Sequence, residues 1–365
     1  RANIIFFLTD DQRNDTLGCV DSRWGEILQT PTIDGLAEEG TRFQNAFVTT
    51  SICAASRASI FTGLYERSHR YTFGRPPVVK KEALKSYPLL MRQAGYRTGF
   101  IGKYGVNMAG NVREKMFDYF KPIHRNPYWV KQPDGSKRHT CQVAGDRAIE
   151  FIKRNGGDAP FCLSVSFNAV HAEDGVKEPS GLLGGHFPYP RATAGLYKDV
   201  DMPPPLLDEQ EVYESQPGFL KESLNRERYF WRWDTPEKYE TNMRGYLRMI
   251  SGVDHVIGRV MQALEKQGVA DNTIIIYSGD NGYYMGERGF AGKWSHYEES
   301  LRVPLIVRDP RLPESAQGRT PEQMALNLDI PELMLRYAGV QVPDQYQGRT
   351  LEPVVRTGST ESARS

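Results

Sequence analysis

Short apolar runs that end abruptly in polar residues recur along the chain and constrain its fold more than any other feature. The first extends from Asn3 to Leu8 and is followed by Thr9, Asp10 and Asp11. An apolar run of this length, stopped by polar residues, is typical of a strand buried on both faces of an α/β sheet. Similar runs occupy residues 98–101, 161–167, 273–277 and 304–307.

Helical patterns lie between these runs. Residues 32–39 and 143–154 have helical spacing and are followed by glycines. The clearest pattern runs from Pro236 to Gln267, with Thr235 as N-cap and Gly268 after its end. Strands that alternate with helices predict a three-layer α/β fold, in which a largely parallel mixed sheet carries helices on both faces. In such folds, sites form at the carboxyl ends of strands.

Two stretches have no clear pattern. Residues 181–205 are rich in glycine and proline, and residues 213–234 carry many aromatic and charged side chains. We expect a loop-rich excursion over residues 172–235 that lies above the site and forms no separate domain.

Composition excludes several classes of protein. The 365 residues carry 46 Lys and Arg against 45 Asp and Glu, which argues against a dedicated nucleic-acid binder. No apolar run approaches the ~20 residues of a membrane span. Four cysteines are too sparse for a disulfide scaffold.

Oxygen-bearing side chains follow two of the apolar runs. Asp10 and Asp11 end the first run, and Asp280 and Asn281 follow residues 273–277. If both strands end at the same sheet edge, these groups form a site for Ca²⁺ or Mg²⁺. The alternative is that the acids cap turns or helices.

A second constellation begins at Cys53, where a strand-like segment, residues 43–49, turns into an expected helix. A helix N-terminus favours an anion. The alternative is a small buried cysteine beside a capped helix.

The string from Cys53 to Gly63 resembles the sulfatase signature Cys-x-Pro-Ser-Arg, followed after three residues by an apolar residue, Thr or Ser, and Gly. Further motifs follow the order of that family: Asp10-Asp11, Gly102-Lys103, His171, Asp280-Asn281-Gly282 and Gly292-Lys293. The chain thus resembles the type I, formylglycine-dependent sulfatases of the alkaline phosphatase superfamily, in particular bacterial carbohydrate sulfatases.

The resemblance implies a modified nucleophile and a metal. Cys53 would be oxidised to Cα-formylglycine, whose hydrate attacks sulfur and later expels sulfate. Asp10, Asp11, Asp280 and Asn281, together with residue 53, would bind Ca²⁺, with Mg²⁺ as the alternative.

The resemblance also assigns the remaining catalytic residues. Arg57 would hold the hydrate, and Lys103 and Lys293 would neutralise sulfate oxygens. His171 would protonate the leaving oxygen. The alternatives are solvated lysines and a histidine satisfied in the core.

The chain departs from the family pattern at two positions. Ala55 replaces the usual proline, which the oxygen-dependent formylglycine-generating enzyme prefers and the anaerobic radical-SAM maturase does not require. We therefore expect poor conversion of Cys53 under aerobic expression. Gly105 replaces a histidine credited with deprotonating the hydrate, so the base for sulfate release is open; Asn107 fills that space but takes no proton.

The substrate is expected to be a sulfated glycan attacked from its end. Trp231 and Trp233 flank Arg232, and aromatic rings stack on sugar faces while arginine pairs with acids. The alternative is that these rings anchor a long loop. A galactose or N-acetylgalactosamine type of sugar is expected. The candidate substrate-binding residues are Asn107, Asp174, Trp231, Arg288 and His296.

Two other functions stay open: a phosphonate monoester or phosphodiester hydrolase of the same superfamily, and a non-catalytic sulfated-glycan binder with unconverted Cys53.

The resemblance implies a catalytic domain over residues 1–345. Residues 346–365 would begin a C-terminal subdomain that is truncated or absent. A periplasmic, cell-surface or secreted location is expected, although the chain contains no signal peptide.

Overall fold

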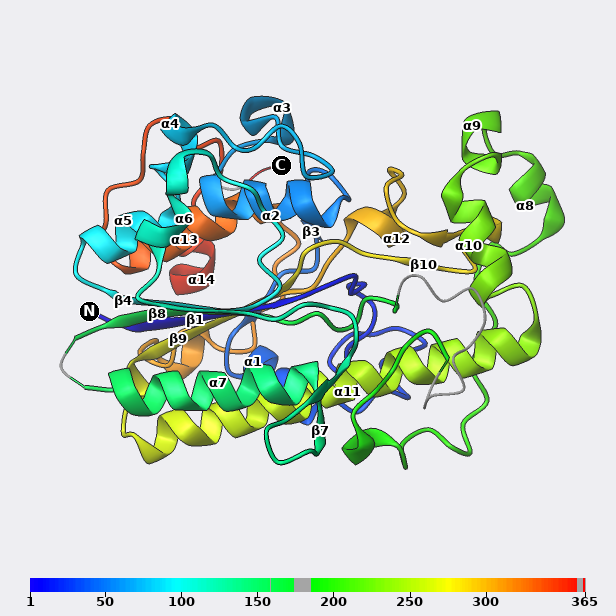
Figure 1. Cartoon of the computed structure of the whole chain (residues 1–365), viewed down its shortest axis with the longest axis horizontal. Coiled ribbons are helices and arrows are strands. Elements are labelled where there is room, and N and C mark those ends of the chain that lie inside the picture. Colours follow the sequence, from blue (N-terminus) through cyan, green and yellow to red (C-terminus); the bar gives the residue numbers. More distant parts are fainter. Residues whose placement is uncertain (158, 174–184, 360–363, 365) are drawn as a thin grey trace.

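The computed structural model describes residues 1–157, 159–173, 185–359 and 364. A seven-stranded sheet, ordered β2-β12-β9-β1-β8-β4-β5, runs through its centre (Figure 1). Its strands are β1 (Asn3–Thr9), β2 (Thr41–Arg42), β4 (Arg97–Gly102), β5 (Tyr119–Pro122), β8 (Phe161–Ser166), β9 (Thr273–Gly279) and β12 (Leu305–Arg308). Only β12 and β2 contribute antiparallel pairings, so the predicted largely parallel mixed sheet is confirmed.

The central strand β1 explains why its sequence is apolar throughout. Successive side chains of a strand point to opposite faces of the sheet. Ile5 and Phe7 pack into the core on one face, whereas Ile4, Phe6 and Leu8 pack into the core on the other. Both faces are covered, so no position of the strand meets water.

Helices cover both faces of the sheet, which confirms the three layers (Figure 1). One face carries α1 (Pro31–Glu38), α7 (Thr140–Asn155) and α11 (Pro236–Lys266). The other carries α2 (Cys53–Thr62), α3 (Glu66–His69), α4 (Lys80–Ala83), α5 (Tyr87–Gln93), α6 (Arg113–Met116), α13 (Ile330–Tyr337) and α14 (Glu352–Thr357). The long helix begins as predicted, because the Thr235 side chain accepts the backbone N–H of Lys238 (3.3 Å).

Short elements surround the carboxyl edge of the sheet. They are β3 (Ala46–Phe47) with β13 (Ala325–Leu326), β6 (Trp129–Lys131) with β7 (Lys137–His139), β10 (Tyr284–Met285) with β11 (Ala291–Gly292), and α12 (Glu298–Leu301). The strand expected over residues 43–49 is therefore only two residues long.

The expectation of irregular structure over residues 213–234 was wrong. This part of the chain forms α8 (Gln210–Glu214), α9 (Gly218–Lys221) and α10 (Leu224–Arg232). The aromatic and charged residues stack on each other, since the Arg226 guanidinium lies 3.9 Å from the ring centroid of Tyr213 and 4.4 Å from that of Phe230. Residues 174–184, including Asp174, lie outside the described residues.

The last part of the chain packs on the α2 side of the sheet. The backbone N–H of Gln347 donates to the carbonyl of Gly63 (2.8 Å), and α14 buries Val354 and Val355. The expected domain boundary after residue 345 stays a prediction.

In the described part of the chain, no helix has the length and apolar character that crossing a membrane requires.

One glycine at the end of β4 allows the close approach of β8. Gly102 has φ 99°, and a Cβ there would lie 1.8 Å from the carbonyl oxygen of Ser166. Both the left-handed backbone and the close backbone neighbour require glycine. Gly102 thereby sets the direction in which the chain leaves β4 toward Lys103.

We expect Gly102→Ala to destabilise the fold by about 3 kcal/mol or more, from backbone strain and overpacking combined. The matched control is Gly35→Ala in α1, where an added Cβ meets nothing within 4 Å. That control should unfold at or slightly above the wild-type temperature, because alanine favours a helix. Thermal unfolding followed by circular dichroism tests both, and equal midpoints for the two variants would contradict the assignment.

Candidate active site

The acidic residues expected to meet do so because their strands are parallel neighbours. β1 and β9 pair from Asn3–Thr273 to Thr9–Gly279, so both end at the same edge. The backbone N–H of Asp280 donates to the carbonyl of Thr9 (2.9 Å) and extends the pairing by one residue. Asp10 and Asp11 therefore lie beside Asp280 and Asn281, all fully or almost fully buried.

Several oxygens of this cluster have no hydrogen-bond partner among the described residues. They are Asp10 Oδ1, Asp11 Oδ2 and Asn281 Oδ1. Asp10, Asp280 and Cys53 each offer a ligand atom within 4.8 Å of the others. A buried carboxylate oxygen that accepts no hydrogen bond raises the free energy of the folded protein, and a hard cation prefers oxygen ligands of this kind. The donor set therefore fits a divalent cation.

Cationic side chains hold the outer oxygens of the same acids. Lys103, which directly follows β4, pairs with Asp10 Oδ2, and Lys293 pairs with Asp11 Oδ1. Arg57 Nε donates to Asp280 Oδ2 (2.8 Å).

Burial and these partners pull the acid pKa values in opposite directions. Burial alone would raise the pKa of Asp10, but the nearby cations, Lys103 foremost, hold it well below its usual range. Burial raises the pKa of Asp280 to about 6, with the nearby Asp10 charge adding to that effect. In this cluster the positive charges of Lys103, Lys293 and Arg57 thus offset the negative charges of the three acids.

Cys53 is the first residue of α2, as predicted, and its side chain is half-buried. Arg57 follows one turn later and donates from Nη1 to the carbonyl of Lys103 (2.6 Å). Cys53, Asp11, His171 and Lys293 line one pocket of about 300 Å³. Free N–H groups and the helix dipole favour an anion there.

His171 enters this pocket from the segment after β8. Its Nδ1 lies 2.7 Å from the carbonyl oxygen of Ala172, which places the proton of the neutral ring on Nδ1. Its Nε2 lies 3.0 Å from Arg125 Nη1 and 3.4 Å from Asp11 Oδ2. Burial lowers the pKa of His171 well below its ordinary value.

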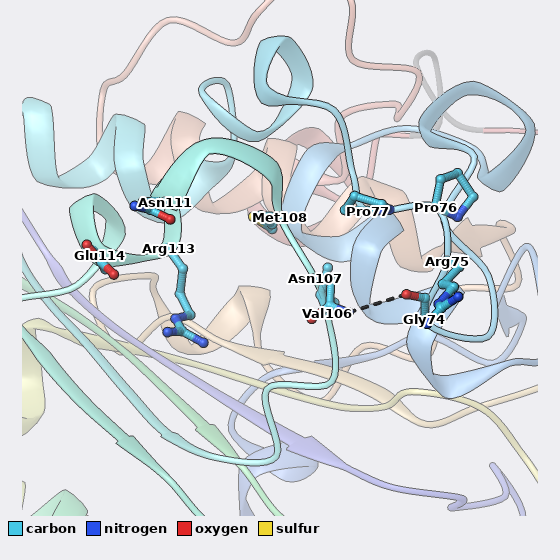
Figure 2. A pocket seen from close by; sticks show the side chains of 10 residues that line it. All are labelled: Gly74, Arg75, Pro76, Pro77, Val106, Asn107, Met108, Asn111, Arg113 and Glu114. Atoms are coloured by element: carbon cyan, nitrogen blue, oxygen red, sulfur yellow. Dashed lines mark hydrogen bonds between the residues drawn. The ribbon is translucent and has the colours of Figure 1, made fainter.

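The four described candidate substrate-binding residues, Asn107, Trp231, Arg288 and His296, lie outside the lining of this pocket. Asn107 donates to the carbonyl of Gly74 (3.3 Å) on the wall of a second cavity of about 580 Å³ (Figure 2). Gly74 lines both cavities, so they adjoin. Arg288 pairs with Glu299 (2.5 Å), His296 is exposed, and Trp231 is half-buried in α10.

The expected pair of sugar-facing tryptophans is not formed. Trp233 lies in the core, with its ring centroid 5.7 Å from that of Phe187. The pocket takes its aromatic residues from elsewhere, namely Tyr71, Phe73, Tyr283 and Trp294. Its further lining includes Gly105, Arg125, Arg228 and Arg232. Of these, Trp294 could have been suspected because it follows Lys293, whereas Phe73 and Arg125 carry no sequence signal.

Comparisons with known proteins agree with this geometry. The Sulfatase family model matches residues 2–340. An N-acetylglucosamine-6-O-sulfatase of Bacteroides thetaiotaomicron is 29% identical over 410 residues, covering 97% of this chain and 71% of that protein. An arylsulfatase of Clostridium perfringens is 26% identical, covering 97% of this chain and 78% of that protein.

Two solved structures share the fold. One, a complex with its substrate D-glucosamine-2-N,6-O-disulfate, has a TM-score of 0.78 and 27% identity, covering 98% of this chain and 80% of its own. A phosphonate monoester hydrolase from Silicibacter pomeroyi has a TM-score of 0.82 and 20% identity, covering 100% of this chain and 78% of its own. With a family model that matches nearly the whole chain, this protein belongs to the sulfatase family of the alkaline phosphatase superfamily.

Proposed function

We propose that the protein hydrolyses the sulfate ester of a sulfated sugar at the end of a glycan, using Ca²⁺ and a formylglycine made from Cys53. The observation that carries this is the position of Cys53 at the start of α2, where its sulfur lies within 4.8 Å of carboxylate oxygens of Asp10 and Asp280, and Asp10 Oδ1 has no hydrogen-bond partner among the described residues. When present, a hydrated aldehyde at position 53 supplies an oxygen nucleophile, and Ca²⁺ held by Asp10, Asp11, Asp280 and Asn281 supplies positive charge.

Lys103 and Lys293 neutralise the sulfate in this proposal. Each ammonium is already fixed by a carboxylate, Lys103 by Asp10 and Lys293 by Asp11. Burial acts to lower the pKa of Lys293, but the combined attraction of the neighbouring acidic groups, Asp11 foremost, raises it. Lys293 therefore stays charged, and positive charge set in place before the reaction stabilises the transition state.

Arg57 holds residue 53 at the start of the helix. It is buried and is fixed by Asp280 and by the carbonyl of Lys103. The family resemblance assigns Arg57 to holding the formylglycine hydrate, and that role requires a guanidinium fixed in this way.

His171 handles the proton of the leaving oxygen. Its Nδ1–H donates to the carbonyl of Ala172, so Nε2, which faces Asp11, carries no proton in the neutral ring and must take one up before it can donate to the leaving oxygen. Among the described lining residues it is the one histidine. Position 105 offers no second one: a Cβ on Gly105 would lie 3.1 Å from Arg57 Cδ.

The relatives favour a glucosamine-type substrate over the galactose or N-acetylgalactosamine type expected from the sequence. One is named an N-acetylglucosamine-6-O-sulfatase, and one solved relative holds a glucosamine disulfate. A relative from Drosophila melanogaster is named an extracellular sulfatase homolog and is 28% identical, covering 97% of this chain and 31% of that protein. This supports an extracellular or periplasmic location, with maturation of Cys53 by a formylglycine-forming enzyme.

The proposed function is tested on protein produced with an anaerobic radical-SAM maturase, with conversion of Cys53 measured by peptide mass. The substrates are 6-sulfated N-acetylglucosamine, a sulfated galactosamine, an aryl sulfate and a phosphonate monoester. We expect inorganic sulfate from the sulfated sugars and none with Cys53→Ala. Faster turnover of the phosphonate ester would favour the alternative hydrolase, and binding without turnover by converted protein would favour a non-catalytic binder.

Removal of the metal should lower stability as well as activity. Ca²⁺ at 100 times its Kd stabilises the native state by about 2.7 kcal/mol, so the unfolding midpoint should fall on chelation and return with Ca²⁺. Asp11→Asn should lose this response. Asp146→Asn, at a surface position paired with Arg138 and Arg259, is the matched control and should keep it. A full Ca²⁺ response in Asp11→Asn would contradict the metal site.

His171→Ala should slow release of a sugar alcohol far more than release of a phenol. A general acid is worth about 10²- to 10⁴-fold for a poor leaving group, whereas an activated aryl oxygen leaves without a proton. Comparing kcat for a sugar sulfate and a nitrophenyl sulfate measures the difference. His255→Ala on the exposed side of α11 is the control. An equal loss on both substrates would argue against proton donation.

A further inference from the structure

Helix α10 presents arginines to the pocket of Cys53 on two successive turns. Arg228 and Arg232 both line that pocket, four residues apart on one face of the helix. The Arg228 guanidinium lies 4.5 Å from the ring centroid of Trp294. Phe73 packs edge-on against the same ring, at 5.5 Å and 82°. Arg228, Trp294 and Phe73 form one cluster at the pocket wall, here called the Arg228 cluster.

The Arg228 cluster is held in place by the backbone around it. Trp294 has φ 84°, a left-handed conformation that a bulky residue rarely adopts. Asn225 Nδ2, on the turn of α10 before Arg228, donates to the carbonyl of Lys293 (2.5 Å). The helix and the segment that carries Lys293 and Trp294 are therefore tied together, and the stacked guanidinium is preorganised.

Arg228 differs from the cations that surround the acids. Lys103, Lys293 and Arg57 each pair with a carboxylate. No carboxylate of the described residues lies within ion-pair distance of Arg228, and its buried Nε has no hydrogen-bond partner among them. Within the described part of the chain its charge is thus not neutralised by an acid, and its side chain lines the pocket.

The pocket offers a cation beyond the one that is fixed at the reaction centre. Lys293 lies in the pocket and pairs with Asp11, whereas Arg228 lines the same pocket and pairs with no described carboxylate. A sulfate monoester carries a single negative charge. A second anionic group on the same ligand would therefore meet Arg228.

We propose that the Arg228 cluster binds a second anionic group of the substrate, a carboxylate or another sulfate, apart from the sulfate that is cleaved. This inference rests on the proposed function, because it assumes a sulfated sugar in the pocket. The planar guanidinium suits either anion, since both accept two parallel hydrogen bonds. The preferred substrate is then a sugar, or a sugar with its neighbour, that bears two negative charges.

Binding to the Cys53→Ala protein, measured by calorimetry, tests this without turnover. The three probes are 6-sulfated N-acetylglucosamine, glucosamine-2-N,6-O-disulfate, and 6-sulfated N-acetylglucosamine linked to a uronic acid. We expect at least one dianionic probe to bind more tightly than the monosulfate. Which one does so identifies the second group as a sulfate or a carboxylate.

Arg228→Gln, added to Cys53→Ala, should weaken the preferred dianionic probe about 10- to 100-fold, as expected for losing a charged hydrogen bond, and leave the monosulfate within about threefold. Arg228→Lys should keep part of the preference. Arg226→Gln is the matched control, because Arg226 stacks on the other side of α10 and donates to Gly289 (2.9 Å) outside the pocket.

Two results would overturn the inference: equal affinity of the Cys53→Ala protein for all three probes, or an equal loss for mono- and dianionic probes in Arg228→Gln. The second would mean that Arg228 only supports Trp294. Failure of the proposed function is separate, since it would appear as no sulfate release from any sugar by the converted wild-type protein.

Discussion

The parallel pairing of β1 with β9 is the constraint on which the rest of the site depends. It brings Asp10 and Asp11 to the same sheet edge as Asp280 and Asn281, although Asp11 and Asn281 are 270 residues apart in the sequence. A slip of one residue would turn Asp10 and Asp11 to the opposite faces. The pairing is secured by strands that are apolar toward both cores, so the same burial that stabilises the sheet also positions the acids.

Placing these acids in the interior has an electrostatic cost that the protein distributes over three elements. Lys103 comes from the end of β4, Arg57 from α2, and Lys293 from the segment after β11. A buried ion pair is weak evidence for stability, because desolvation offsets attraction. Here the pairs leave oxygens unsatisfied at the centre, which is a poor arrangement for stability alone and a suitable one for a divalent cation.

The reaction centre and the binding wall arise from different parts of the chain. Groups at the centre lie at strand ends and at the start of α2, on rigid elements that fix their geometry. The wall comes from α10 and from the segment around Phe73, outside the sheet. This division fits a family in which the chemistry is constant and the substrate varies, because wall segments can change without disturbing the sheet.

The sequence by itself determined the strands, the long helix and the chemical types at the strand ends. Burial on both faces leaves an unbroken apolar run, as in Ile4 to Leu8, and a cap such as that at Thr235 is a local interaction. Only the tertiary structure decided which side chains form the pocket wall. Trp233 and Trp294 have the same side chain, yet Trp233 is buried beside Phe187 whereas Trp294 stacks against the Arg228 guanidinium. Asn107 likewise lines the adjoining cavity and not the pocket of Cys53 (Figure 2). These outcomes depend on the paths of segments far apart in the chain, which no local pattern records.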